Sequence, residues 1–211
     1  FGLVAVVDGA VRFAHLFFAK QASQKEWTEV ISESMRGHII ICGAGRVGFR
    51  IANQLTALGK EVVVIEKREG APFAMALQDL NVPVLIDDAR NPRALARLNV
   101  KEAQAIVCCT DDDLGNINVG LDARKHNPQI RIVMRLFDED LAARVRENFR
   151  AEAHSTSVLS GQTLALSTLD PRIVHSFSIG AHLMVVSQFV AGAPLATLDI
   201  GALRDRYGGL T

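Results

Sequence analysis

The 211-residue sequence has little that would support metal or thiol chemistry. Its three cysteines, Cys42, Cys108 and Cys109, lie in apolar runs without the paired spacing of zinc ligands. The six histidines form no HExxH pattern, and no GxSxG motif or Ser/His/Asp arrangement stands out. We therefore expect reduced cysteines buried in strands, and no metal site.

The sequence also has no excess of positive or negative charge. Lys and Arg total 23 and Asp and Glu total 23, so the formal net charge is zero. No clustered basic face is apparent, whereas a nucleic-acid-binding domain carries one. We expect no nucleic-acid partner.

A complete membrane-spanning run is missing as well. Residues 1–19 are mostly apolar but contain Asp8, Arg12 and His15, and a full span needs roughly 20 predominantly apolar residues. The segment lacks the basic start and cleavage site of a signal peptide. It is either the cytoplasmic end of a membrane helix or an amphipathic helix that packs on the domain or on a partner. The chain opens on Phe1 and stops directly after a helical pattern, so we expect a piece of a longer protein.

What the sequence does contain is a glycine pattern in a specific setting. An apolar run at 39–42 leads into GxGxxG, and a second apolar run ends in Glu66, 18 residues past the last glycine. This context is typical of dinucleotide-binding folds, in which the glycines allow a tight turn, close backbone approach to pyrophosphate and helix–strand packing. The helix N-terminus would then face phosphate, and the acidic side chain would face a ribose diol. The loop residues are Gly43, Ala44, Gly45, Arg46, Val47 and Gly48.

The hydrophobic pattern alternates between short apolar runs and amphipathic segments from His38 onward. Strands are predicted at 38–42, 61–66, 83–86, 105–109 and 130–135, with a short one near 153–155. Helices are predicted at 46–58, 72–80, 92–98, 113–126 and 138–149. Wholly apolar strands between helices indicate an α/β fold with a Rossmann-like, doubly wound parallel sheet covered on both faces.

The alternation of short apolar strands and amphipathic helices ends after residue 156. Helices are predicted at 160–167 and 171–182, a strand at 183–190, and a short helix at 199–207 with Asp199 as its N-cap. We interpret residues 1–36 as the apolar helix and a helical linker, 37–156 as the Rossmann domain, and 157–211 as crossover helices with part of a C-terminal lobe.

Ligands of doubly wound sheets bind at the carboxyl ends of the strands. The polar residues expected there are Glu66, Asp87, Asp88, Thr110, Asp111 and Arg135. The acidic run 111–113 is explained by helix capping more readily than by metal binding, and the same holds for Asp138 and its acidic neighbours. Arg135 fits a phosphate contact or a structural ion pair equally well.

Residues 36–149 resemble the RCK domain, also called the TrkA-N domain, a cytoplasmic regulator of potassium channels and transporters. The resemblance is carried by the segment 38–48, Glu66, the pair Asp88-Ala89, the segment 110–113, Asn116, the pair Ala123-Arg124 and the segment 132–135. Residues 183–207 are similar to the opening of the lobe that often follows, and the stretch before Gly37 is similar to the inner-helix end of a two-helix potassium channel.

The resemblance implies a role for each matching residue. Arg46 would reach phosphate, either in its own pocket or on a nucleotide in a neighbouring subunit, while Asp88 and Ala89 would flank adenine. Many relatives have glycine where this chain has Asp87, which puts the purine preference in doubt. Glu66 disfavours a 2′-phosphate, although Lys67 and Arg68 follow it and could soften that discrimination. The residues predicted to bind nucleotide are Gly43, Ala44, Gly45, Arg46, Val47, Gly48, Glu66, Lys67, Asp87, Asp88, Ala89, Thr110, Asp111, Asn116 and Arg135.

The function expected from the resemblance is regulation without turnover. The domain would bind NAD(H) or ATP, ADP or AMP and gate a potassium channel or transporter at the cytoplasmic face of the plasma (inner) membrane. A homodimer through the helices at 138–149 and 160–182, and a larger gating ring, would be its assembly. Two alternatives stay open: the nucleotide-binding tail of a cation/proton antiporter, and an NAD-dependent oxidoreductase.

Overall fold

A computed structural model of the chain describes residues 32, 34–179, 182–188, 190, 199, 201, 202 and 205. The predicted apolar helix at 1–19, most of the linker and most of the helix at 199–207 lie outside these residues. Where the end of the chain is described, Asp199 accepts the Ala202 N–H at 2.7 Å, as an N-cap does. No helix in the described part of the chain is both long and apolar enough to cross a bilayer. Contacts divide the chain into two compact units, Phe1–Thr156 and Ser157–Thr211, and each is described by itself.

The first unit is built on a six-stranded sheet in which every neighbouring pair is parallel, with the order β3-β2-β1-β4-β5-β6. Strand β1 lies between β2 and β4, so the strand order reverses at this point. In register, Ile39 of β1 is level with Val62 of β2 and with Ala105 of β4. The strands are β1 (Ile39–Cys42), β2 (Val62–Glu66), β3 (Val84–Ile86), β4 (Ala105–Cys108), β5 (Arg131–Leu136) and β6 (Glu152–Ser155).

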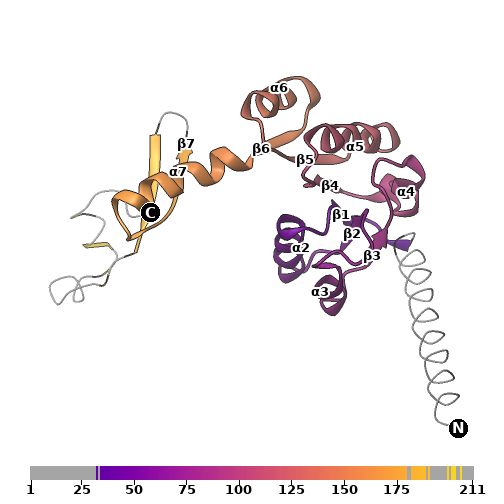
Figure 1. Cartoon of the computed structure of the whole chain (residues 1–211), viewed down its shortest axis with the longest axis horizontal. Helices are drawn as coiled ribbons and strands as arrows, with labels where there is room; N and C mark the ends of the chain where they lie inside the picture. The colour runs from indigo at the N-terminus through magenta and orange to yellow at the C-terminus, as the bar shows by residue number, and fades with distance from the viewer. Residues whose placement is uncertain are drawn as a thin grey trace, which may run out of the picture. The chain divides into compact units, whose positions relative to one another are not determined.

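Helices cover both faces of this sheet (Figure 1). Two of them pack on one face and three on the other, as the two separate apolar clusters of the core show. The first face carries α2 (Arg46–Ala57) and α3 (Ala74–Asp79). The second carries α4 (Pro92–Arg97), the 3₁₀ turn η1 (Val100–Glu102), α5 (Asp113–His126) and α6 (Glu139–Phe149).

The strands form because they are apolar on both sides. All four residues of β1 and all five of β2 are buried, which explains why the sequence shows continuous apolar runs there and no alternation. The predicted Rossmann-like doubly wound sheet is confirmed, and in the first unit the predicted strands and helices agree with the observed ones to within one or two residues. The short strand predicted near 153–155 is β6, which adds the sixth strand at the edge beside β5.

The second unit contains α7 (Thr156–Leu169), β7 (Ile173–Ile179) and β8 (His182–Ser187). The two strands pair antiparallel, with Phe177 level with Met184. The helix predicted at 171–182 is therefore wrong, because this segment is strand β7. Its β-branched and aromatic residues favour a pleated strand, and pairing with β8 decides the choice. The prediction rested on helical periodicity and overlooked that β8, which begins three residues after β7 ends, could pair with this segment as a hairpin.

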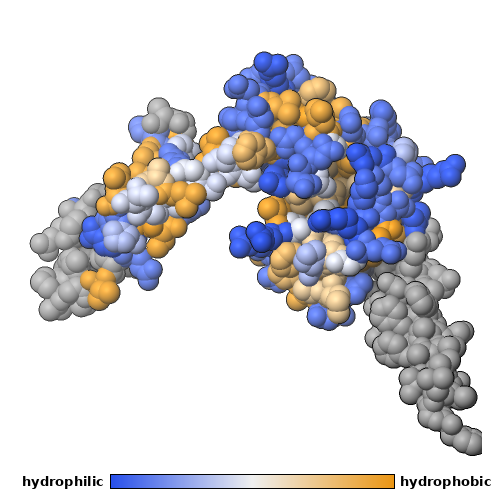
Figure 2. All heavy atoms as spheres, viewed as in Figure 1, coloured by the Kyte–Doolittle hydropathy of each residue, from blue (hydrophilic) through white to orange (hydrophobic). Residues whose placement is uncertain are grey.

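Apolar side chains lie on the surface of this second unit (Figure 2). No residue of α7 is buried, and every residue of β8 is exposed. A two-stranded hairpin with so little buried surface is marginal in water by itself. The exposed large apolar residues of the described part of this unit are Val158, Leu159, Leu164, Leu169, Val174, Phe177, Ile179, Leu183, Met184, Val185, Val186 and Val190.

Candidate functional site

A cavity of about 730 Å³ lies at the carboxyl end of the sheet, beside the point where the strand order reverses. Loops that follow β1, β2, β3 and β4 line it, together with the first turns of α2 and α5. This is where doubly wound sheets bind their ligands. The lining residues are Gly43, Gly45, Arg46, Val47, Ile65, Glu66, Lys67, Arg68, Asp88, Ala89, Arg90, Cys109, Thr110, Asp111, Asp112, Gly115, Asn116, Val119 and Arg135.

The three glycines of the loop have different structural roles. Gly43 has φ +108°, a left-handed conformation that side chains disfavour. A Cβ at Gly48 would lie 1.9 Å from the Gly43 carbonyl oxygen, so only glycine fits there. A Cβ at Gly45 would meet nothing within 4 Å, and the φ of this residue is an ordinary −80°. The fold thus requires Gly43 and Gly48, whereas Gly45 keeps space open over the cavity.

The N-terminus of α2 carries no internal cap. Its N-cap is Gly45, no side chain caps it, and its first turn holds no acidic residue. The first bond into the helix runs from the Phe49 N–H to the Gly45 carbonyl, at 2.9 Å. By contrast, α5 and α6 are capped by Asp112 and Asp138 and carry acidic residues in the first turn. The free N–H groups and positive dipole end of α2 are therefore not satisfied by a side-chain cap, and helix starts of this kind favour anions.

Glu66 is held in place by two backbone amides. Its Oε2 accepts the Ala44 N–H at 2.7 Å, and its Oε1 accepts the Arg68 N–H at 2.9 Å. The residue is only 7% exposed. Because a carboxylate oxygen has two lone pairs, each oxygen keeps one acceptor position for a ligand hydroxyl. Glu66 thus ties the glycine loop to the end of β2 and still lines the cavity.

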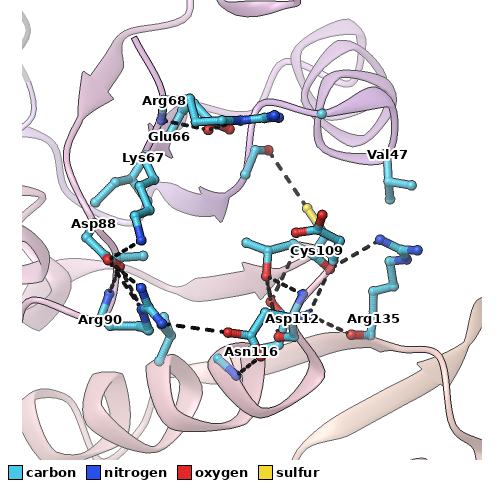
Figure 3. A pocket seen from close by; sticks show the side chains of 18 of the residues that line it. Val47, Glu66, Lys67, Arg68, Asp88, Arg90, Cys109, Asp112, Asn116 and Arg135 are labelled. Atoms are coloured by element: carbon cyan, nitrogen blue, oxygen red, sulfur yellow. Dashed lines mark hydrogen bonds and ion pairs between the residues drawn. The ribbon is translucent and has the colours of Figure 1, made fainter. Parts of the chain in front are cut away.

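Asp88 is paired with two basic side chains on the β3 side of the cavity (Figure 3). Arg90 donates to both of its oxygens, from Nε at 3.0 Å and from Nη2 at 2.7 Å, and the Lys67 Nζ lies 3.3 Å from Oδ2. The Arg90 guanidinium holds the pKa of Asp88 well below its ordinary value. Arg90 Nη1 also lies 3.7 Å from Asp112 Oδ2, so it connects the β3 loop with the start of α5.

Asp87 lies outside the cavity lining. Its Oδ2 lies 2.7 Å from Arg97 Nη1, and its Oδ1 accepts the Asp88 N–H at 2.7 Å. The side chain that replaces the glycine of many relatives is thus engaged with the end of α4.

Asn116 joins the ends of β4 and β5. Its Oδ1 accepts the Thr110 N–H at 3.1 Å and the Thr110 hydroxyl at 2.7 Å. Its Nδ2 donates to the carbonyls of Thr110 and Arg135, at 3.1 and 2.9 Å. These four bonds use both lone pairs and both protons of the amide, and the residue is 1% exposed. Asn116 therefore shapes the cavity wall through Thr110 and Arg135.

Two cations at the cavity have no acidic partner within the described residues. Arg135 donates from Nη1 to the Thr110 carbonyl at 3.2 Å, and Arg46 is exposed at the start of α2. A structural ion pair, one of the two interpretations of Arg135, is absent from this part of the chain. Both guanidinium groups remain available to an anion in the cavity.

The cysteines are free and buried, as predicted. Cys109 lines the cavity and donates its thiol to the Cys42 carbonyl at 3.3 Å. Burial raises the pKa of the Cys109 thiol to about 12, so it stays protonated and unreactive at neutral pH.

The acidic run before α5 has capping and tethering roles. Asp112 Oδ1 accepts the Gly115 N–H at 2.9 Å, and Asp113 Oδ2 accepts the Phe137 N–H at 2.8 Å. Asp111 is exposed at the cavity. Among the residues that the structure describes, no three His, Cys, Asp or Glu side chains are arranged to hold a metal ion.

Most of the predicted site residues meet at this one cavity. Of the others, Ala44 and Gly48 are buried behind the loop. Seven lining residues are absent from the predicted binding residues, although two of them, Arg68 and Asp112, are noted in the sequence for other reasons. Several of them directly neighbour a predicted residue at a strand end, so extending each strand-end prediction by two positions would have found them. The missed residues are Ile65, Arg68, Arg90, Cys109, Asp112, Gly115 and Val119.

Curated proteins of potassium transport are similar to this chain in sequence. Potassium channel protein 1 of Methanocaldococcus jannaschii is 25% identical over 142 residues, which cover 67% of this chain and 43% of that protein. A Trk system potassium uptake protein TrkA homolog of Pyrococcus abyssi is 33% identical over 106 residues, covering 48% of this chain and 44% of that protein. The glutathione-regulated potassium-efflux system protein KefC of Cronobacter sakazakii is 28% identical over 127 residues, covering 60% and 20%. The chain thus spans less than half the length of each.

Solved structures share the fold. The TrkA-N domain of the inner membrane protein ybaL from Escherichia coli aligns with a TM-score of 0.58 at 22% identity, covering 65% of this chain and 99% of that one. The AMP-bound Kef C-terminal domain of Shewanella denitrificans gives 0.53 at 23%, covering 63% and 81%. The NAD-bound GsuK channel gives 0.52 at 21%, covering 66% and 24%. The sequence pattern of the TrkA-N domain family matches residues 39–157, which is more than half of the chain. The chain belongs to the TrkA-N domain family.

Proposed function

We propose that the domain binds an adenine nucleotide in the cavity and uses it as a regulatory signal for a potassium channel or transporter. The observation that carries the proposal is the uncapped N-terminus of α2, which opens over Gly45 into a cavity with Glu66 on its wall. An anion and a hydroxyl-bearing group next to it are what such a site recognises.

The phosphate position lies over the loop. The N–H groups at the start of α2 point to it, and Arg46 and Arg135 supply charge that no described acidic residue neutralises. Backbone donors and guanidinium groups together bind phosphate oxygens strongly, because each bond is charge-assisted. A neighbouring subunit's nucleotide is a second possible target of Arg46, since this side chain is exposed.

The ribose and adenine positions lie on the β2 and β3 side. The open acceptor positions of Glu66 suit ribose hydroxyls, and its charge opposes a 2′-phosphate. Lys67 and Arg68 could soften that opposition, because Arg68 Nε lies 3.7 Å from Glu66 and both basic side chains are largely exposed. Asp88 and Ala89 would flank the adenine, while Thr110 and Asp111 would close the pocket. The ligands that fit are NAD(H), ATP, ADP and AMP.

Binding is tested by calorimetry on the whole chain with AMP, ADP, ATP, NADH and NADPH. We expect saturable binding of at least one of the first four and weaker binding of NADPH than of NADH. Failure of all five to bind, or preference for NADPH, would overturn the proposed ligand class.

The proposal assigns no turnover to the domain. The thiol in the cavity is protonated, and Asp88 and Glu66 are engaged with the protein's own donors. An oxidoreductase would need a catalytic acid or base beside the nicotinamide. NADH consumption measured against a broad substrate panel separates the two hypotheses, and sustained turnover would exclude the regulatory one.

Potassium transport is proposed from the relatives named above, which include a channel, an uptake protein and an efflux protein. In this role the domain works at the cytoplasmic face of the membrane beside a pore or transporter subunit. The nucleotide would shift the population between two arrangements of paired domains, to the extent that it binds one arrangement better. Because one of these relatives is a potassium-efflux protein, the tail of a cation/proton antiporter stays the second candidate. Potassium flux through the full-length protein in vesicles, with and without nucleotide, tests regulation; replacing the potassium gradient with a proton gradient distinguishes an antiporter from a channel.

A homodimer is proposed from the second unit. Helix α7 and strand β7 of this unit leave apolar residues such as Leu164 and Phe177 in water, and a second copy of the chain would cover them. Together with α6 these contacts would build the larger ring. Sedimentation of the wild-type chain and of Leu164→Asp tests this. We expect the variant to shift toward monomer, and a monomeric wild type would contradict the dimer.

A further inference from the structure

The few described residues just before β1 are fastened to one segment of the first unit. The Asn99 side chain donates to the Met35 carbonyl at 2.9 Å, and the Gly37 N–H donates to the Glu102 carbonyl at 2.7 Å. Arg36 adds an exposed ion pair to the Glu102 carboxylate at 3.1 Å. Residues 35–37 thus form each of their described polar contacts with the domain through residues 99–102.

His38 continues the same attachment inside the core. It is fully buried, and its Nε2 lies 2.9 Å from the Leu98 carbonyl oxygen. The carbonyl of Leu98, the side chain of Asn99 and the turn η1 therefore hold four successive residues of the chain, from Met35 to His38.

The other end of this segment is a wall of the cavity. Asp88, Ala89 and Arg90 line the cavity, and α4 begins directly after them, where Asn91 caps the helix by accepting the Arg93 N–H at 3.1 Å. At a rise of 1.5 Å per residue, the six residues of α4 span about 9 Å between the cavity wall and Leu98.

A single carboxylate ties the two ends together. Asp87 Oδ1 accepts the Asp88 N–H at 2.7 Å, while its Oδ2 lies 2.7 Å from the guanidinium of Arg97, the last residue of α4. Both side chains of this ion pair are about one quarter exposed. Ala94 and Leu95 within α4, and Leu98 directly after it, are fully buried, so these residues anchor α4 to the core.

We propose that Arg97 is a positioning residue, because its ion pair with Asp87 sets the backbone at Asp88 and Ala89. Through this ion pair, α4 and η1 connect the cavity with residues 35–37. A ligand that contacts Asp88, or that draws Arg90 away from it, changes the ion pairing of Asp88 and, next to it, that of Asp87. The change reaches Arg97 through the bond between the Asp88 N–H and Asp87 Oδ1. This inference rests on the proposed nucleotide site and adds the path by which nucleotide binding would affect residues 35–37.

The Gly37 amide reports on the far end of this route, because its bond to the Glu102 carbonyl must open before it exchanges. A ligand that fixes the cavity wall reduces such opening in the segment attached to it. Hydrogen–deuterium exchange of this amide is measured by NMR in the whole chain, with and without the nucleotide that binds most tightly by calorimetry. We expect nucleotide to slow exchange at Gly37 several-fold in the wild type.

Arg97→Gln is the test variant, and Arg131→Gln is a control that removes a more exposed ion pair elsewhere in the first unit. Arg131 forms an ion pair of the same 2.7 Å length with Glu152, in strands β5 and β6 away from α4. We expect Arg97→Gln to bind nucleotide more weakly and to lose the response at Gly37 at saturating nucleotide. Arg97→Lys, which keeps the charge, should restore part of the response, and Arg131→Gln should keep all of it.

Each result has a defined meaning. Binding by the wild type with no change at Gly37, or a full response in Arg97→Gln, would overturn this inference and leave the proposed function standing. Absence of binding by the wild type in calorimetry would overturn the proposed function, and this inference with it.

Discussion

The Glu66 carboxylate accepts the Ala44 backbone N–H at 2.7 Å, across 22 positions of sequence. This bond joins the end of β2 to the glycine loop at the end of β1, and it is buried. One side chain therefore has two tasks, since it holds the loop in shape and presents its remaining acceptor positions to the cavity.

We predict that Glu66→Gln weakens nucleotide binding more than tenfold. An amide has only one acceptor oxygen, so its NH₂ group would face the N–H of Ala44 or of Arg68. The same conflict should lower the free energy of unfolding by about 1–3 kcal/mol. Calorimetry and chemical denaturation measure the two effects. Unchanged affinity would show that the cavity is not the nucleotide site.

The glycines should separate binding from folding. Gly45→Leu is expected to abolish nucleotide binding and leave the melting temperature nearly unchanged, because its Cβ meets nothing within 4 Å and its φ is ordinary. Its side chain would occupy the proposed phosphate position.

Gly48→Ala is the contrasting variant. Its Cβ would fall 1.9 Å from the Gly43 carbonyl oxygen, so the helix must move away from the strand. We expect a clear loss of stability in thermal melts. A Gly45→Leu chain that unfolds, or a Gly48→Ala chain as stable as wild type, would contradict the assignment of these two roles.

Asn116→Ala should cost both stability and affinity. It removes four part-buried hydrogen bonds, including the one that satisfies the Thr110 N–H, and a donor left unsatisfied in this way costs about 1–3 kcal/mol. Asn127→Ala is the control, since Asn127 donates to the carbonyls of Val100 and Ala103 at the opposite end of α5. It should lower stability without changing nucleotide affinity. Equal affinity in both variants would mean that Asn116 does not shape the cavity.

Stability should fall on acidification because of His38. Burial lowers the pKa of His38 below its ordinary value of 6.5. Between the folded pKa and 6.5 the unfolded chain therefore binds a proton that the folded chain does not. The contribution of neutral His38 is fully present above pH 6.5 and is lost as pH falls below it. Urea denaturation at pH 7.5 and at pH 5.5 measures the difference in wild type. His38→Gln should show a smaller difference, because all other histidines are retained; an equal difference would place the effect elsewhere.

The sequence by itself determined the Rossmann-like fold and the glycine loop. Strands such as Ile39–Cys42 are buried on both faces, so their continuous apolar runs are visible locally, and the helices between them show their own periodicity. The requirement for glycine at 43 and 48 follows from the turn between such a strand and helix. Candidate residues such as Glu66 and Asp88 could be named because they end strands.

Only the tertiary structure decided what these residues do. The bond from Ala44 to Glu66, the clamp from Asn116 to Thr110 and Arg135, and the pairing of Asp87 with Arg97 each join residues that lie 6 to 22 positions apart in sequence. The same cause explains the error at Ile173–Ile179, whose conformation depends on pairing with β8. Hydrophobic periodicity indicates which side of a helix or strand is buried. The partner of each side chain depends on how the elements pack together, which the local sequence does not specify.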